Sequence, residues 1–116
     1  QAREVAKSIP MMEKAAAKSD EGELYVRLGN VYLDGDQFTK AADSVEKGLK
    51  KGGVKRPDQA RLVLGMAYFN LGEYNKARRA FREAGKDDRS AKYSKQWIAY
   101  VTSEEDRQRE LEKDLF

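Results

Sequence analysis

Residues 64–77 read LGMAYFNLGEYNKA, and residues 28–41 read LGNVYLDGDQFTKA. Both stretches begin with Leu-Gly-x-x-Tyr and end in Ala, and 36 residues separate their equivalent positions. The similarity continues downstream, where Val45 corresponds to Phe81 at the same offset. Self-similarity at a fixed period of this length indicates a repeat architecture, in which each unit buries its apolar face against its neighbours.

Apolar periodicity and turn residues predict six helices, over residues 3–18, 22–34, 37–51, 57–71, 73–85 and 90–114. Pro10 either kinks the first of them or marks its true start, and Gly35 suits a left-handed cap after the second. The last helix is expected to be continuous, although residues 102–105 could form a capping box that divides it. Because no stretch alternates with a strand period, the fold class is predicted to be all-α.

A third unit is predicted by extending the same period once more, which leads to Trp97, Tyr100 and Val101 as counterparts of Arg61, Leu64 and Gly65. This unit matches only in its first helix. Residues 103–114 are mostly charged or polar, and a terminal repeat needs a polar outer face. We therefore expect the last helix to cap the stack.

The stretch from Leu64 to Ala77, followed by Phe81 and Ala84, resembles a tetratricopeptide repeat. The unit over residues 22–53 resembles one too, with Val45 in the place of the Phe. The resemblance implies a right-handed α-solenoid of antiparallel helix pairs, although the period is longer and the proline that closes each unit is missing. The implied segments are a tail helix of a preceding repeat (1–21), two repeats (22–57 and 58–93), and a partial repeat with a capping helix (94–116).

The repeated residues are interpreted as core. Gly29 and Gly65 would allow the two helices of one unit to cross closely, with Ala41 and Ala77 on the opposite side of the contact. Three aromatic side chains would fill the space between units: Tyr32, Tyr68 and Phe81.

The first helix of each unit would line a concave groove, because the resemblance assigns the other face of these helices to packing. Apolar side chains on the exposed stripe suit a groove that accepts a peptide or helix of another protein. The alternative is that they pack against the first segment or a second copy of the chain. The candidate groove residues are Val26, Asn30, Leu33, Leu62, Met66, Phe69 and Ile98.

Some tetratricopeptide domains hold a terminal carboxylate with Lys, Asn and Arg. Asn30 matches one such position, but Val26 and Val63 stand where Lys and the next Asn are expected. The resemblance therefore does not extend to carboxylate binding.

The composition argues against catalysis. The 116 residues contain no Cys and no His, which excludes thiolate or imidazole nucleophiles, bases and metal ligands. Asp34 and Asp36 flank a glycine without the other ligands of a calcium loop. We therefore expect a non-enzymatic interaction scaffold without cofactor or metal.

The formal charge is +3, with basic residues concentrated between residues 40 and 100. Solvated helix faces explain such residues, and no aromatic stacking motif accompanies them, so nucleic acid is not expected as a partner. No apolar run in the sequence approaches the length of a membrane span, which needs about 18 residues.

The chain starts at Gln1 without an initiator Met, and we expect the natural protein to extend upstream. Two alternatives to a groove-binding scaffold stay open: a segment of a longer repeat array, and a self-associating module. Residues 48–84, with Gln96, Trp97 and Ile98, also resemble the C-terminal part of bacterial repeat proteins associated with TonB energy-transduction systems. That weaker resemblance implies a periplasmic location, although a cytoplasmic one is equally compatible with the composition.

Overall fold

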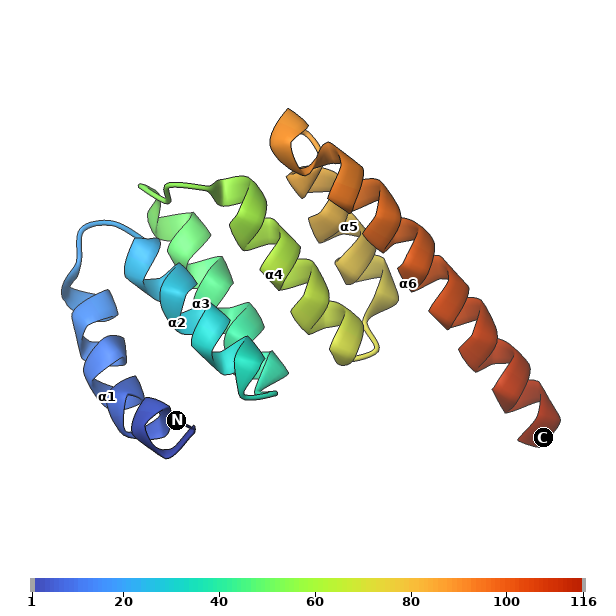
Figure 1. Cartoon of the computed structure of the whole chain (residues 1–116), viewed down its shortest axis with the longest axis horizontal. Coiled ribbons are helices and arrows are strands. Elements are labelled where there is room, and N and C mark those ends of the chain that lie inside the picture. The colour runs from blue at the N-terminus through green and yellow to red at the C-terminus, as the bar shows by residue number, and fades with distance from the viewer. Residues whose placement is uncertain (1, 116) are drawn as a thin grey trace.

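The computed structural model describes residues 2–115, which form six α-helices and no strand (Figure 1). The helices are α1 (Ala2–Lys18), α2 (Glu23–Asp34), α3 (Phe38–Lys51), α4 (Pro57–Asn70), α5 (Tyr74–Ala84) and α6 (Asp88–Leu115). The predicted all-α class is confirmed, and α6 is continuous as expected. Pro10 lies inside α1 and does not mark its start.

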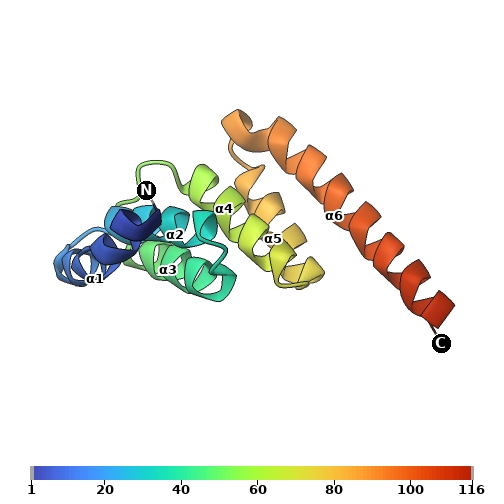
Figure 2. The same ribbon diagram turned by 60° about the horizontal axis from the view of Figure 1, so that its bottom comes forward.

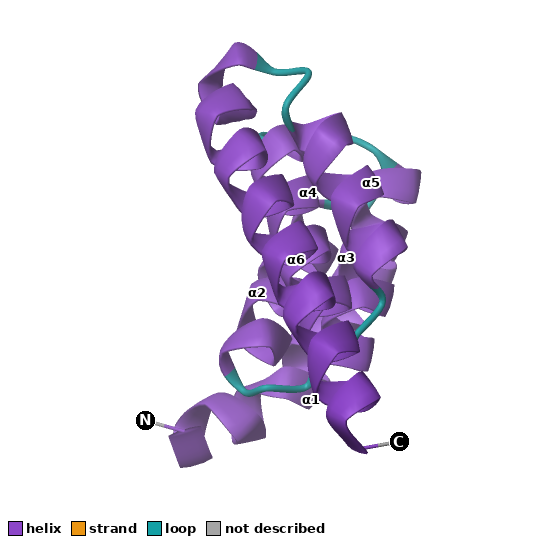
Figure 3. Cartoon of the chain, turned by 90° about the vertical axis from the view of Figure 1, so that its right-hand side faces the viewer, coloured by secondary structure: helices purple, strands orange, loops and turns teal. Residues whose placement is uncertain are grey.

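The helices form two layers. Each helix packs against the next one along the chain, and α2 also contacts α4, which in turn contacts α6. The inner layer therefore consists of α2, α4 and α6, while α1, α3 and α5 form the outer layer; Figure 3 shows α3 and α5 together on one side of α6. The result is a helical-repeat solenoid with extents of 49 × 34 × 22 Å.

Glycines allow the paired helices to cross closely. A Cβ atom on Gly65 would lie 2.6 Å from the ring of Phe81, and one on Gly29 would lie 2.4 Å from Cγ2 of Val45. The predicted role of both glycines is confirmed. The nearest side chain is at the Val45/Phe81 position, and the backbone carbonyl oxygen of Ala41 lies 3.3 Å from the same point at Gly29.

A second crossing, which the sequence analysis missed, joins the start of α2 to the end of α3. A Cβ atom on Gly22 would lie 1.8 Å from the carbonyl oxygen of Gly48. Because the obstacle is backbone, neither helix can adjust by turning a side chain.

We expect Gly22→Ala to lower the free energy of unfolding by about 1–3 kcal/mol, as overpacked sites do. Urea denaturation measures the loss. Gly35→Ala is the matched control, because a Cβ atom there would meet only carbonyl oxygens at 3.6 and 3.7 Å, an ordinary contact. Equal midpoints for the two variants would contradict the close crossing.

The turn after α2 differs from the prediction. Gly35 has φ −91°, which any residue adopts, whereas Asp36 has φ 59°. The left-handed position therefore falls one residue later than expected, on Asp36, a residue type that tolerates it because its short polar side chain can hydrogen-bond locally.

The α6 helix does not follow the 36-residue period. The α4 residues buried towards α3 include Ala60, Leu64 and Ala67, and their counterparts Ser94, Ile98 and Val101 pack towards α5. Each counterpart lies 34 residues after its α4 residue, two fewer than the 36-residue period requires. We call this spacing of 34 residues the shorter interval. The 36-residue period pairs Leu64 with Tyr100 instead, yet Leu64 is 8% exposed and Tyr100 is 49% exposed.

The connections explain the difference between the two spacings. Residues 52–56 join α3 to α4, whereas only residues 85–87 join α5 to α6. The shorter connection brings the apolar face of α6 onto α5 earlier in the sequence.

The core around α6 is aromatic. The ring of Phe81, 0% exposed, stacks on Trp97 with 5.1 Å between centroids, and Phe69 meets Trp97 in an edge arrangement with 6.3 Å between centroids. Beyond this cluster α6 continues past α5, as Figure 2 shows, and the side chains of residues 106–115 are all exposed.

Candidate partner-binding groove

A pocket of about 470 Å³ lies between α2 and α4 in the inner layer. Its apolar floor comes from both helices, and polar side chains surround it on the side of their amino termini. The lining residues are Glu23, Val26, Arg27, Asn30, Lys55, Arg56, Gln59, Ala60, Leu62, Val63 and Met66. Four of the seven candidate groove residues, namely Val26, Asn30, Leu62 and Met66, therefore line one pocket.

These four residues differ in accessibility. Val26 is 7% exposed and contributes floor, while Leu62 and Met66 are half-buried. Asn30 is exposed, and its amide donates a hydrogen bond to the Val26 carbonyl of its own helix at 3.3 Å. Its carbonyl oxygen faces no donor among the described residues.

The other three candidates lie outside this pocket. Leu33 is half-buried against the core formed by α2, α3 and α4. Phe69 is half-buried in the aromatic cluster, where its ring centroid is 5.3 Å from that of Tyr100. Ile98 is half-buried against the cluster of Ala77, Phe81 and Val101, because the shorter interval turns it towards α5.

The α6 helix presents different residues to the inner side. Gln59, Leu62 and Met66 line the pocket on α4, and their counterparts at the shorter interval are Tyr93, Gln96 and Tyr100. Tyr93 is 58% exposed and Tyr100 is 49% exposed. A surface pocket of about 300 Å³ is lined by Gln96, Trp97 and Tyr100. Sequence reasoning missed this aromatic surface because it used the 36-residue period for α6.

The face of α6 where a further outer helix would pack is polar. On α4, the residues next to α5 include Arg61, Gly65 and Phe69. Their counterparts at the shorter interval are Lys95, Ala99 and Ser103, and all three are exposed. A polar outer face is what a terminal helix needs.

A buried ionic network holds the amino-terminal ends of α4 and α6 together beside the groove. Asp58, 2% exposed, accepts two hydrogen bonds from the Arg56 guanidinium at 2.9 and 2.6 Å and one from the Ser90 hydroxyl at 2.7 Å. The Arg56 hydrogen bonds, with that from Ser90, hold the pKa of Asp58 well below its usual range.

The charges at the pocket rim are mostly paired. Glu23 accepts a hydrogen bond from the Lys55 backbone N–H at 3.1 Å and lies 3.7 Å from Arg27, while Arg56 is held by Asp58. The rim thus orders the loop between α3 and α4 and leaves the apolar floor open between the helices.

The described residues hold no group of three or more acidic, His or Cys side chains suited to a metal ion. Within the same residues, no helix has the length and hydropathy that a membrane span needs.

Comparison with known protein families identifies one match: residues 58–90 match the tetratricopeptide repeat family. The matched residues comprise α4, α5 and the start of α6, and the match supports the predicted family. Repeats of this family mediate protein–protein interaction and are generally not enzymes. No curated protein and no solved structure matches the chain.

Proposed function

We propose that the chain is a non-enzymatic scaffold that binds a peptide or helix of another protein along the inner face of α2, α4 and α6. The observation that carries this proposal is the aromatic surface of α6: Tyr100 is 49% exposed and its ring centroid lies 5.3 Å from that of half-buried Phe69, and Tyr93 on the same helix is 58% exposed. Exposed apolar and aromatic side chains that gather on one concave face are typical of partner surfaces.

The composition of this surface suits a peptide ligand. Tyrosine offers a large contact area and loses little conformational entropy on binding, and methionine adapts to irregular partners. The Asn30 and Gln96 side chains supply hydrogen bonds that an extended backbone or a helix end can use. The groove therefore comprises Val26, Asn30, Leu62 and Met66 with Tyr93, Gln96 and Tyr100.

We expect Met66→Glu combined with Tyr100→Ala to weaken binding of a peptide selected against the parent chain by at least about 30-fold, the loss of about 2 kcal/mol that defines a binding hot spot. Peptide display supplies the ligand, and isothermal titration calorimetry measures both affinities.

Lys95→Ala is the matched control, because it changes the exposed face of α6 that does not line the groove. It should bind like the parent. Phe69→Ala is a poorer test, since Phe69 contacts Trp97 and Tyr100 and its truncation also affects folding. Equal affinity of the parent and the double variant would exclude the groove as the binding site.

A second candidate function is self-association or incorporation into a longer repeat array. It is favoured by α1, where Met11 is 75% exposed and Val5 is 42% exposed. Light scattering tests it: a monomer over a wide concentration range excludes self-association. The periplasmic, TonB-linked setting stays a prediction from sequence resemblance, and the genomic neighbours of the gene test it.

A further inference from the structure

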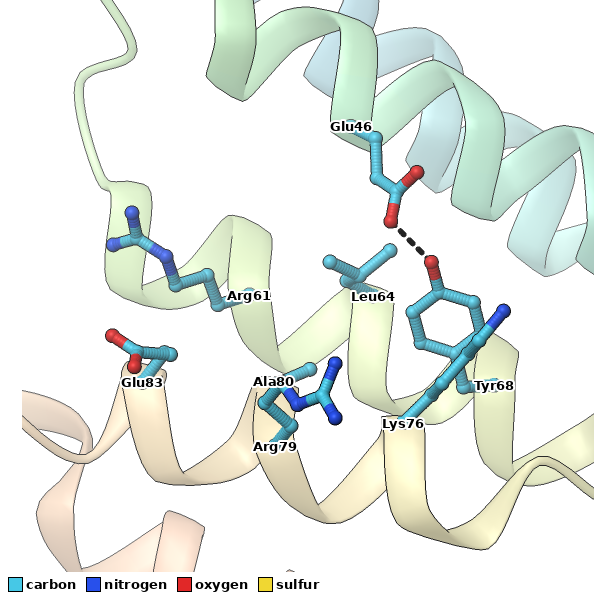
Figure 4. A pocket seen from close by; sticks show the side chains of 8 residues that line it. All are labelled: Glu46, Arg61, Leu64, Tyr68, Lys76, Arg79, Ala80 and Glu83. Atoms are coloured by element: carbon cyan, nitrogen blue, oxygen red, sulfur yellow. Dashed lines mark hydrogen bonds between the residues drawn. The ribbon is translucent and has the colours of Figure 1, made fainter.

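A pocket on the opposite side of α4 lies between α3 and α5 and has a volume of about 320 Å³ (Figure 4). Leu64 and Ala80 form its floor, at 8% and 6% exposure. The ring of Tyr68 forms one wall, with the ammonium of Lys76 5.5 Å from the ring centroid. We call this pocket the α5 niche.

The carboxylates that line the α5 niche already have partners. Glu46 accepts a hydrogen bond from the Tyr68 hydroxyl, which Figure 4 marks. Glu83 pairs with Lys86 at 2.9 Å, and this contact lowers the pKa of Glu83. Lys86 therefore offsets the charge of Glu83, whereas the Tyr68 hydroxyl is neutral and Glu46 keeps its negative charge in the niche.

The two guanidinium groups of the niche lack such compensation. Arg61 and Arg79 have no carboxylate oxygen within 4.0 Å among the described residues. The charge of Arg61 contributes to the lowered pKa of Glu83, but the two groups form no direct ion pair. In Figure 4 both side chains border the same pocket. A guanidinium offers a planar fork of donors that matches two oxygens of one anion.

An equivalent pocket one repeat earlier serves as an internal comparison. It measures about 360 Å³, and Leu28, Tyr32 and Lys40 occupy the places of Leu64, Tyr68 and Lys76. The Lys40 ammonium likewise lies 5.8 Å from the Tyr32 centroid. We call it the α3 niche.

The two niches differ in their arginines. Tyr25 and Asp43 stand in the α3 niche where Arg61 and Arg79 stand in the α5 niche. Since the same fold is built at both places, packing of the repeat does not require the two guanidinium groups. The charged lining of the α3 niche is balanced, with Lys40 and Lys47 against Glu13 and Asp43, whereas that of the α5 niche has an excess of positive charge.

We propose that Arg61, Lys76 and Arg79 form a binding site for a phosphoryl group, separate from the groove. The niche holds an excess of positive charge, because two guanidinium groups face Glu46, the one lining carboxylate without a cation within 4.0 Å among the described residues, and Lys76 lies 3.7 Å from Glu73. This excess attracts the charge of about −1.5 to −2 that a phosphate monoester carries at neutral pH. A phosphoryl group also presents three oxygens, enough for both guanidinium forks and the ammonium. The phosphoryl group belongs either to free phosphate or to a phosphorylated side chain of a bound protein.

The test is a titration followed by NMR, with the side-chain and backbone N–H signals of the arginines as reporters. Inorganic phosphate and a phosphoserine peptide are added in turn at constant ionic strength maintained with chloride, because salt screens exposed charges. We expect saturable shifts at Arg61 and Arg79, and none at Lys40 or Asp43 in the α3 niche.

Arg61→Gln combined with Arg79→Gln should weaken phosphoryl binding by about 10- to 100-fold, as loss of charge-assisted hydrogen bonds does. Arg82→Gln combined with Lys92→Gln is the matched control, since it also removes two positive charges, both at exposed positions outside the niche. Arg79 is exposed and Arg61 half-buried, so a thermal melt should show the double variant folded.

The two ligands distinguish the sources. Tighter binding of the phosphopeptide than of phosphate, with no shift from the unphosphorylated peptide, assigns the niche to a phosphorylated partner, and equal affinities assign it to free phosphate. Absence of saturable binding, equal shifts in both niches, or an unchanged dissociation constant in the double variant would overturn the proposal.

Discussion

Replacing Phe81 by alanine will lower the free energy of unfolding by about 3–5 kcal/mol, the range found for truncation of fully buried aromatic side chains. Phe81 is 0% exposed, and its ring occupies the space that Gly65 leaves open on α4. The same ring stacks on Trp97 of α6 with planes 9° apart. One truncation therefore removes contacts on both sides of α5.

Urea denaturation measures this loss as a lower midpoint at unchanged slope. Arg82→Ala, at the next and exposed position, is the control and should cost less than about 0.5 kcal/mol. Because each repeat contacts only its neighbours, amide exchange in Phe81→Ala should accelerate most in α6 and least in α2. A midpoint within error of the Arg82→Ala value would show that Phe81 does not hold the two layers together.

Replacing Asp58 by alanine will cost about 2–4 kcal/mol at neutral pH, because the change leaves a buried hydroxyl without its acceptor and a guanidinium without its counter-charge. The hydroxyl is that of Ser90, which is 2% exposed, and the guanidinium is that of Arg56. The loss stays below that of a fully buried ion pair, because the Arg56 side chain is 33% exposed and water can solvate it.

The effect depends on pH in a defined direction. The folded chain holds the pKa of Asp58 below its usual value, so the stabilisation is complete above the pKa of about 3.9 that Asp has in unfolded chains. It is lost as the pH falls from there through the lower folded pKa. The difference in stability between parent and Asp58→Ala should therefore be full at pH 7 and shrink below about pH 4.

Denaturation at a series of pH values measures this difference. Asp106→Asn is the control, since its side chain is 65% exposed and pairs only at 3.9 Å within its own helix. A constant difference between parent and Asp58→Ala from pH 7 to pH 2 would show that the carboxylate charge does not stabilise the fold.

The sequence predicted the two complete helix pairs because their packing residues recur at one interval. Leu28 and Leu64 point into the core in both units, and Gly29 and Gly65 face the same position of the following helix. These contacts lie within a unit or between adjacent units of equal length, so the repeat alone determines them. Helix ends agree within a few residues for the same reason.

The α6 helix was predicted in the correct place but rotated about its axis. Each residue turns a helix by about 100°, so an error of two residues exchanges nearly opposite faces. Trp97 and Tyr100 resembled aromatic packing positions at the 36-residue interval, and the short connection over residues 85–87 gave no indication of the change. The alternative signal was the spacing of Ser94, Ile98 and Val101, which matches Ala60, Leu64 and Ala67.

The contacts of Asp58 and of the α5 niche could not be predicted from the sequence. Asp58 follows Pro57 in the first turn of a helix, where acidic residues are ordinary, and its partner Ser90 belongs to a different helix. Arg61 and Arg79 read as solvated helix faces because their lack of carboxylate partners depends on how α4 and α5 are packed.

The part of α6 that extends beyond α5 is stabilised differently from the part that packs against α5. Up to Val101 the helix is fixed by tertiary packing, but residues 106–115 have only their own backbone hydrogen bonds and pairs such as Lys113 with Glu110 at 3.3 Å. Isolated helical turns of this length are marginal in water. The end of α6 therefore unwinds and reforms without the rest of the solenoid, as a gradual change that precedes cooperative unfolding.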